Sequence, residues 1–323
     1  MRWIFTLLIL LSIASILIGI FVGSVNVGVP DLISYLSGHQ DVKGYILWQI
    51  RIPRTLAAFL GGACLALSGL LLQTYFRNPL AGPFVLGISS ASSLAVALCM
   101  LAGIGAHSLG IVGSAFLGAM VATIIVITLA AKVRSAVTLL VAGLMLGYIF
   151  SALEKILITF AESREVHVFV LWTFGSFSGI TWSNLKTITL AGVPIMAIAF
   201  LLSKPLNALL LGEDYARSMG VDVRRIRVAI VSISSLLTAL VTAFAGIVAF
   251  IGLAVPHIAR LLLRTSDHRV LIPSTALVGG IVTVLCDVIS RTLLNPVELP
   301  ISVATSLFGA PIVIYLVIKR RRI

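Results

Sequence analysis

The sequence predicts an all-α integral membrane protein with about ten transmembrane helices. Hydrophobic residues make up 59% of the 323 residues, charged residues make up only 11%, and the mean hydropathy is +1.16. A chain of this composition has too little polar surface to cover a soluble globule. Its 23 lysines and arginines fall almost entirely between long apolar runs, and these runs have the length needed to cross a bilayer.

The predicted spans are apolar stretches of roughly 20 residues within one polytopic domain over residues 1–323. They lie near 4–25, 54–76, 84–104, 109–131, 137–160, 185–203, 227–248, 250–265, 271–291 and 302–318. The first span follows Met1-Arg2 and has no Ala-x-Ala cleavage site, so we expect it to be retained rather than removed as a signal peptide.

The basic residues predict the orientation. With the amino terminus inside, ten spans place sixteen basic residues in the cytoplasm and leave seven outside. The seven are Lys43, Arg51, Arg54, Lys155, Arg164, Lys186 and Arg291. The positive-inside rule therefore favours two cytoplasmic termini. The same loops explain the net charge of +12, which in a soluble protein would indicate nucleic acid, and we expect no nucleic-acid partner here.

Two connections are long enough to hold structure of their own. Residues 26–50 are predicted as an outer loop with a short helix over Pro30–Leu36, ended by Gly38. Pro53 is expected to prevent the next helix from starting earlier. Residues 204–226 are predicted as the longest cytoplasmic loop.

A spacing is repeated between the two halves of the chain. Gly69 precedes Pro79 by ten residues, and Gly246 precedes Pro256 by ten residues, each in a span rich in glycine and alanine. The two spans run in opposite directions in the ten-span prediction. This pattern is typical of an inverted internal repeat, from which many transporters are built.

Polar and proline-rich motifs interrupt the spans. In chain order they are Arg51-Ile-Pro-Arg54, Gly69-x3-Gln73-x3-Arg77-Asn78-Pro79-Leu80-Ala81-x-Pro83-x2-Leu86-Gly87-Ile88-Ser89, Ala243-Phe244-x-Gly246-x3-Phe250-Ile251-Gly252-Leu253-x2-Pro256-His257-x2-Arg260, Asp267-His268-Arg269, Asp287-x3-Arg291-x6-Glu298-Leu299-Pro300 and Gly309-Ala310-Pro311. With these motifs in this order, the chain resembles the permease subunits of the iron-chelate (siderophore), haem and vitamin B12 class of ABC importers. It departs from the family at Ala91-Ser92, where the family usually has Gly-Ala, and at Ser302, where it usually has Gly.

This resemblance implies a homodimer of ten-span subunits in the bacterial cytoplasmic membrane, surrounded by lipid, with the translocation path on the dimer axis. It also implies two ATPase subunits on the cytoplasmic side and a periplasmic or lipid-anchored substrate-binding protein outside. The sequence contains no Gly-x4-Gly-Lys-[Ser/Thr] motif, so its energy is expected to come from another chain or an ion gradient. The resemblance implies the first of these: a transport subunit that is not an enzyme, binds no cofactor and receives energy from a separate ATPase. The cargo stays open between siderophore, haem and cobalamin.

The resemblance assigns two sets of site residues by motif position. Binding-protein docking falls to Arg51, Arg54 and Arg291, whose guanidinium groups suit bidentate pairing with carboxylates. The alternative is that these arginines only reach the water at the lipid boundary. The cytoplasmic gate falls to Asn78, Leu80 and Thr138.

The loop Leu211–Asp222 resembles the family's coupling helices, which contact the ATPase. Acidic residues in its first turn suit a helix amino terminus, and a glycine at its end suits a left-handed cap. Leu211, Tyr215 and Met219 recur every four residues and form one narrow apolar face. The residues assigned to coupling are Glu213, Asp214, Ala216, Arg217 and Gly220. The alternative is a helix lying on the membrane surface.

Two other functional classes remain as alternatives. An ion-coupled secondary transporter needs an intramembrane carboxylate, and we identify only Asp287; its spacing from Arg291 favours a local ion pair over a proton relay. An intramembrane enzyme would need a catalytic motif, and the sequence contains neither His-Glu-x2-His nor Gly-x-Ser-x-Gly. His257 is expected to be a hydrogen-bonded core histidine, and no metal site is predicted.

Overall fold

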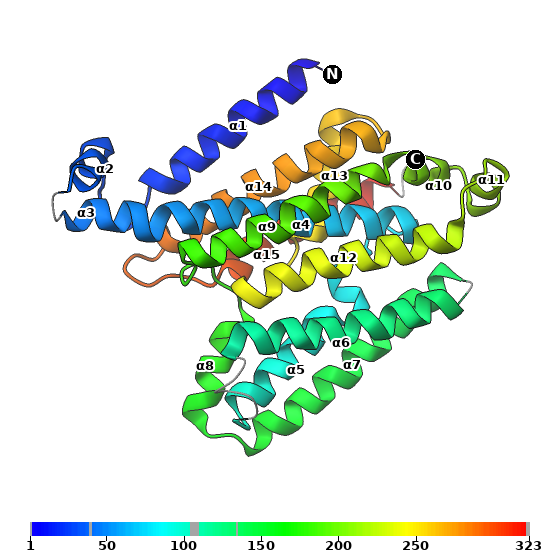
Figure 1. Ribbon diagram of the computed structural model, residues 1–323, viewed down its shortest axis with the longest axis horizontal. Helices are drawn as coiled ribbons and strands as arrows, with labels where there is room; N and C mark the ends of the chain where they lie inside the picture. The colour runs from blue at the N-terminus through cyan, green and yellow to red at the C-terminus, as the bar shows by residue number, and fades with distance from the viewer. Residues whose placement is uncertain (1, 39–40, 104–109, 134, 321–323) are drawn as a thin grey trace.

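A computed structural model describes residues 2–38, 41–103, 110–133 and 135–320, and all regular elements in these ranges are helical (Figure 1). The elements are α1 (Arg2–Phe21), α2 (Val29–Leu36), α3 (Val42–Tyr45), the π-helix η1 (Ile46–Arg51), α4 (Ile52–Phe76), the 3-10 helix η2 (Pro83–Leu86), α5 (Ile88–Met100), α6 (Gly110–Lys132), α7 (Ala136–Phe160), α8 (Ser163–Thr173), α9 (Trp182–Leu201), α10 (Ser203–Leu210), α11 (Glu213–Ser218), α12 (Val223–Ala245), α13 (Ile251–Leu263), α14 (His268–Thr292) and α15 (Ile301–Arg320). The predicted all-α class is confirmed.

Each of the ten predicted spans coincides with a helix, but these helices differ in length. Within the described chain, seven helical spans are long and apolar enough to cross a membrane. The three shorter apolar helices are Ile88–Met100, Ile251–Leu263 and Ile301–Tyr315. A 13-residue helix rises only about 20 Å, against about 30 Å of hydrocarbon. The prediction of ten full-length spans is therefore not confirmed at α5 and α13, whereas α15 extends over 20 residues to Arg320.

The second span begins earlier than predicted. The short helix α2 lies where expected and is followed by Gly38 at a positive φ of 89°, but α3 and η1 then run without a break into α4. The expectation that Pro53 prevents an earlier start is therefore wrong. Pro53 lies in the first turn of α4, directly after the π-helical turn. Because that turn widens the backbone, the helix accommodates a residue that has no N–H to donate.

Helix α4 forms the centre of the fold. In the helical span Val42–Phe76, 83% of the most apolar stretch is buried, against 11% in α7. Glycines make this burial possible, since a Cβ at Gly69 would lie 1.6 Å from the Gly252 carbonyl oxygen on α13. A Cβ at Gly62 would lie 2.3 Å from the Gly279 carbonyl oxygen on α14. Small residues at helix contacts let the two backbones pack directly against each other in a membrane.

The two long helices α4 and α12 run in opposite directions (Figure 1). Gly69 lies inside α4 whereas Gly246 caps the end of α12, so the repeated Gly–Pro spacing does not mark equivalent positions. The likeness lies instead in the segments after the two helices, because each helix leads into an irregular stretch and then a 13-residue helix. Discontinuous helices of this kind are common in transporters built from repeats. The architecture thus supports an inverted repeat that pairs α4–α5 with α12–α13.

The irregular segment after α12 is satisfied by internal hydrogen bonds. The Ser302 hydroxyl donates to the Ile247 carbonyl at 2.7 Å and accepts from the Ala249 N–H at 3.3 Å. The Ser176 N–H donates to the Ala245 carbonyl at 2.8 Å. Non-helical backbone at membrane depth needs such partners because lipid supplies none. Ser302, where the family usually has glycine, therefore contributes a hydroxyl that glycine lacks.

The helices form two groups (Figure 1). One group surrounds α4 and includes α1, α9, α12, α13 and α14; the other contains α5, α6, α7 and α8 and packs on the first through α12 and α6. Helices α10 and α11 lie at one end of the molecule, which we call the inner end. The opposite end, which carries α2 and the segment 293–300, is called the outer end. Helix α15 ends towards the inner end, and α1 runs from its first residue towards the outer end (Figure 1).

Candidate functional site

The outer end contains a buried ion-pair cluster centred on Arg54. The Arg54 Nε lies 3.0 and 3.1 Å from the two carboxylate oxygens of Asp287, and its Nη2 lies 3.0 Å from the same group. The Arg54 Nη1 faces Glu298, at 3.1 and 3.0 Å from the two carboxylate oxygens. One guanidinium group therefore holds two carboxylates along two different edges, as its planar fork of donors allows.

The other two outer arginines hold the end of α1. Arg51 donates to the carbonyls of Phe21 at 3.0 Å and Val25 at 2.5 Å, and Arg291 donates to the carbonyl of Gly19. The last carbonyls of a helix have no partner within the helix, and the helix dipole places negative potential there. Arg51 and Arg291 therefore act as cationic caps that fix α1 against α4 and α14.

The structure partly agrees with the sequence at this cluster. The predicted local pair is confirmed, with the Arg291 Nε lying 3.7 Å from Asp287. All three outer arginines are 4% exposed and face internal partners, so they are not a free water-facing surface. The docking role stays a prediction. It requires that an internal partner of these arginines first moves away. Sequence reasoning missed the Arg54–Asp287 pair because 233 residues separate the two.

The inner end presents the predicted coupling helix as α11. Gly212 precedes α11 and Gly220 follows it, and both have a positive φ. The apolar face is exposed, with Leu211 66%, Tyr215 53% and Met219 59% accessible. The charged residues pair within the helix, and the distances are 3.5 Å for Arg217–Glu213 and 3.7 Å for Arg217–Asp214. Ala216 is fully buried against the rest of the inner end.

Arg227 connects α11 to the helices behind it. Its Nη2 lies 3.6 Å from a Glu213 carboxylate oxygen, and its Nη1 donates to the Val133 carbonyl between α6 and α7. Its guanidinium carbon lies 5.6 Å from the centre of the Tyr75 ring on α4, in a cation–π contact. The side chain is 6% exposed. A displacement of α11 would therefore be transmitted to α4 and to the α6–α7 turn.

A second set of contacts joins α10 to the end of α4. Arg77 has a left-handed backbone at the carboxyl end of α4, and its side chain donates to the Leu209 carbonyl at 2.8 Å. Asn207 on α10 contacts His268 Nδ1 at 2.7 Å, and His268 Nε2 lies 2.9 Å from the Thr74 hydroxyl. Two side chains at the end of α4 are thus joined to α10, one directly and one through His268.

Asp267 stabilises the turn between α13 and α14. Its carboxylate accepts from the Arg269 N–H at 3.0 Å and from the Asn207 amide at 2.6 Å. The hydrogen bond from the Arg269 backbone, followed by that from Asn207, holds the pKa of Asp267 below its ordinary value. The carboxylate therefore stays ionised at neutral pH and caps the amino terminus of α14.

The predicted gate residues lie on two elements at the inner end. The Asn78 side chain accepts from the Leu80 N–H at 2.9 Å, which forms a turn, and Leu80 is 45% exposed. Thr138 lies exposed in the first turn of α7. Helix α7 packs on η2, and a Cβ at Gly143 would lie 2.7 Å from the Val85 carbonyl oxygen. The gate role stays a prediction.

His257 is hydrogen-bonded, as expected, because its Nε2 lies 2.8 Å from the Pro79 carbonyl oxygen. Within the described part of the chain, no three His, Cys, Asp or Glu side chains gather as they would around a metal ion. The histidine instead joins α13 to the turn after α4.

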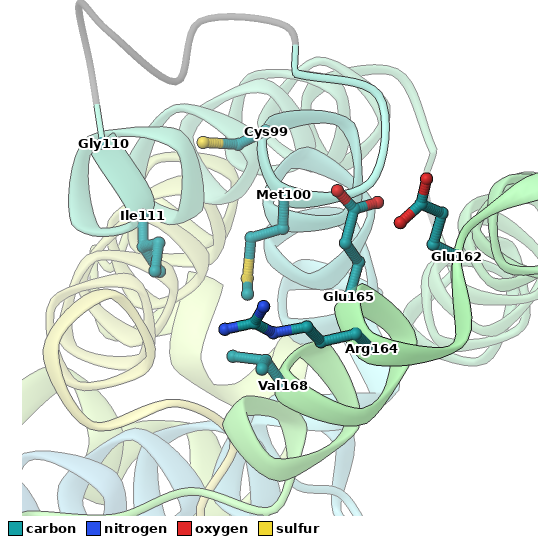
Figure 2. A pocket seen from close by; sticks show the side chains of 8 residues that line it. All are labelled: Cys99, Met100, Gly110, Ile111, Glu162, Arg164, Glu165 and Val168. Atoms are coloured by element: carbon teal, nitrogen blue, oxygen red, sulfur yellow. The ribbon is translucent and has the colours of Figure 1, made fainter.

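An open cavity of about 520 Å³ lies at the outer end where α5, α6 and α8 meet (Figure 2). It is lined by Cys99, Met100, Gly110, Ile111, Glu162, Arg164, Glu165 and Val168. In Figure 2 the guanidinium group of Arg164 points towards Met100, and the two carboxylates point away from it. The charged side chains are exposed, and water screens their mutual attraction. None of the charged side chains that line this open cavity is buried, so none is held in place to orient a ligand.

Comparison with known proteins identifies the family. The model of the FecCD transport family matches residues 8–319. The vitamin B12 import system permease protein BtuC of Salmonella typhi is 38% identical over 324 residues, covering 99% of this chain and 96% of that protein. The corresponding protein of Salmonella newport (strain SL254) has the same identity and coverage.

Solved structures agree with this match. A metal-chelate type ABC transporter in an inward-facing conformation superposes with a TM-score of 0.87 and 32% identity, covering 98% of this chain and 99% of that one. PsaBC from Streptococcus pneumoniae superposes with a TM-score of 0.56 at 18% identity, which shows a shared fold alone. With a family model over nearly the whole chain and full-length relatives above 30% identity, this protein belongs to the FecCD transport family.

Proposed function

We propose that this chain is the permease subunit of an ABC importer that moves vitamin B12 or a metal chelate into the cytoplasm. The observation that carries the proposal is the full-length similarity to a vitamin B12 import permease, together with the fold of a metal-chelate type ABC transporter. The cargo classes are cobalamin and iron chelates, including siderophores and haem. The subunit itself provides the membrane path, and a separate ATPase provides the energy.

The inner end supports a role in coupling to ATPase subunits. Helix α11 is short, exposed and apolar along one face, which suits insertion into a groove of a partner protein. Arg227 joins α11 to α4, and Arg77 joins the neighbouring α10 to the end of α4. Helix α4 then leads directly into the Asn78–Leu80 turn. We infer that closure of the ATPase dimer moves α11, and that α4 transmits the movement to the gate residues Asn78, Leu80 and Thr138.

The proposed assembly contains two copies of this chain, two ATPase subunits at the inner end and a substrate-binding protein at the outer end. The positive-inside count supports cytoplasmic termini. The outer cluster offers guanidinium groups to glutamates of the binding protein, through Arg51, Arg54 and Arg291. An ion-coupled mechanism has no support, because Asp287 forms ion pairs with Arg54 and Arg291.

Reconstitution tests this proposal. The permease is placed in liposomes with its ATPase and its binding protein, and uptake of cobalamin, a ferric siderophore and haem is measured with ATP inside. We expect uptake of one cargo class that requires both ATP hydrolysis and the binding protein. Uptake driven by a proton or sodium gradient without ATP, and abolished by an ionophore, would support the secondary-transporter alternative instead.

A further inference from the structure

Glu298 is the only member of the outer cluster, among the residues described here, whose side chain meets water to a large extent. Its side chain is 44% exposed, whereas those of Arg54 and Asp287 are 5% and 2% exposed. It covers the Nη1 edge of Arg54, while Asp287 occupies the inner edge of the same guanidinium group. Removal of the Glu298 carboxylate would therefore open one edge of Arg54 to the outside and leave the other edge paired.

The segment that carries Glu298 has few internal ties. Residues 293–298 lie between α14 and α15 and are all exposed. Leu293, Leu294 and Val297 are 61%, 56% and 64% exposed, although they are apolar. The N–H groups of the segment donate from Leu293 to the Ile289 carbonyl, from Val297 to the Leu294 carbonyl and from Leu299 to the Ser290 carbonyl. A segment with little buried apolar surface opens at low free energy.

The charge balance favours a carboxylate as the incoming group. The cluster contains three guanidinium groups and two carboxylates, so its net charge is +1 with Glu298 in place. Displacement of Glu298 raises the net charge of the cluster to +2. A second carboxylate restores the original balance with the same bidentate geometry, whereas a cation or a neutral group leaves a buried arginine undercompensated.

We propose that Glu298 is an exchangeable occupant of Arg54, and that a carboxylate of the substrate-binding protein displaces it on docking. This inference rests on the proposed docking of a binding protein at the outer end. It explains how arginines that are buried in the free subunit can serve a partner. Because one carboxylate replaces another on Arg54, this contact contributes to the free energy of docking only the difference between the two ion pairs. The complex is then specific for an acidic partner and still able to dissociate after delivery.

The test compares Glu298→Gln with Glu165→Gln in the reconstituted complex. Glu165 is also an exposed outer glutamate, but it forms no ion pair with a described residue, so its variant controls for loss of surface charge alone. We expect Glu298→Gln to bind the purified binding protein about tenfold tighter, because the competing charge is gone. Its affinity should also fall more steeply between 0.1 and 1 M salt, where the screening length shrinks from about 10 to 3 Å. Glu165→Gln should bind as the wild type does.

Two further measurements separate the exchange from the docking itself. Glu298→Asp keeps the negative charge and should bind between the wild type and Glu298→Gln. Backbone hydrogen exchange in residues 293–300 should rise when the binding protein docks on the wild type, because the segment leaves Arg54. Thermal unfolding of each variant confirms that the subunit is folded.

The outcomes are distinguishable. Weaker docking by Glu298→Gln would show that Glu298 contacts the partner directly, and would overturn the exchange. Unchanged docking by Glu298→Gln, with docking lost in Arg54→Ala, would leave the docking proposal standing and the exchange wrong. Unchanged docking in both variants would contradict the docking proposal itself.

Discussion

The outer and inner ends of this subunit carry similar numbers of ionic pairs and use them differently. At the outer end, Arg54 and Asp287 are nearly inaccessible to water and join α4 to α14. On α11, the Arg217 pairs are made within one exposed helix, where the Arg217 side chain is 60% exposed. A buried ion that loses its partner destabilises the fold strongly, whereas an exposed ion is still solvated by water. The outer charges therefore hold the fold, while the exposed charges of α11 remain accessible to another protein.

The largest expected effect is at Asp287. Asp287→Ala leaves Arg54 and Arg291 without their shared carboxylate, and we expect the free energy of unfolding to fall by about 3–5 kcal/mol. The matched control is Asp214→Ala on α11, whose side chain is fully exposed. Unfolding by denaturant titration in detergent measures both. Equal stability of the two variants would contradict the view that ion pairs stabilise the fold at the outer end and not on α11.

The next effect concerns the attachment of α1. Arg51→Leu removes the donor to the carbonyls of Phe21 and Val25, and we expect a loss of about 1.5–3 kcal/mol, typical of hydrogen bonds to a charged group. Hydrogen exchange should rise at the end of α1 before it rises elsewhere. Arg164→Leu, an exposed outer arginine, is the control. Unchanged exchange in α1 would show that α1 is held by apolar packing alone.

A smaller effect tests the link from α10 to α4. Arg77 and Arg264 both have a left-handed backbone at a helix end, with φ of 47° and 49°. Only Arg77 donates a side-chain hydrogen bond to a described residue, at Leu209. Alanine at each site keeps the same backbone strain, so Arg77→Ala should be less stable than Arg264→Ala by about 0.5–1.5 kcal/mol.

The same pair of variants tests whether movement at the inner end is transmitted to α4 through Arg77. Arg77→Ala should lower the stimulation of ATPase activity by loaded binding protein, and Arg264→Ala should leave it at the wild-type level. If both variants lower the stimulation equally, the left-handed turn itself, rather than the Arg77 side chain, is what matters.

The smallest effect on stability is expected on α11. A double charge reversal, Asp214→Lys with Arg217→Glu, should change the free energy of unfolding by less than about 0.5 kcal/mol, because exposed pairs contribute little. The same variant should separate ATP hydrolysis from transport if α11 contacts the ATPase. Stimulation and uptake both at wild-type level in the reconstituted complex would rule out the coupling role. A large loss of stability would instead show that the charges of α11 stabilise the fold, as those of the outer cluster do.

Local patterns explain which features the sequence could predict. The Asp287–Arg291 pair, the α2 helix ended by Gly38 and the α11 helix flanked by glycines each depend on residues a few positions apart. Helical periodicity and capping rules act over that range. The π-helical turn before Pro53 was not predicted, because a proline in a sequence ordinarily indicates a helix start.

The sequence by itself determined the membrane environment, the approximate position of each apolar helix, the short amphipathic helix α11 and, through ordered motifs, the family. These features depend on composition and on contacts between residues near each other in the sequence, so they can be predicted without the tertiary structure. Only the tertiary structure decided that Arg54 lies between Asp287 and Glu298, that Arg51 and Arg291 hold α1, and that Arg227 joins α11 to α4. The physical reason is distance along the chain. Arg54 and Asp287, for example, are 233 residues apart, and such partners meet only after small residues such as Gly62 and Gly69 have let the helices pack. Rules that relate near neighbours in the sequence cannot predict these contacts.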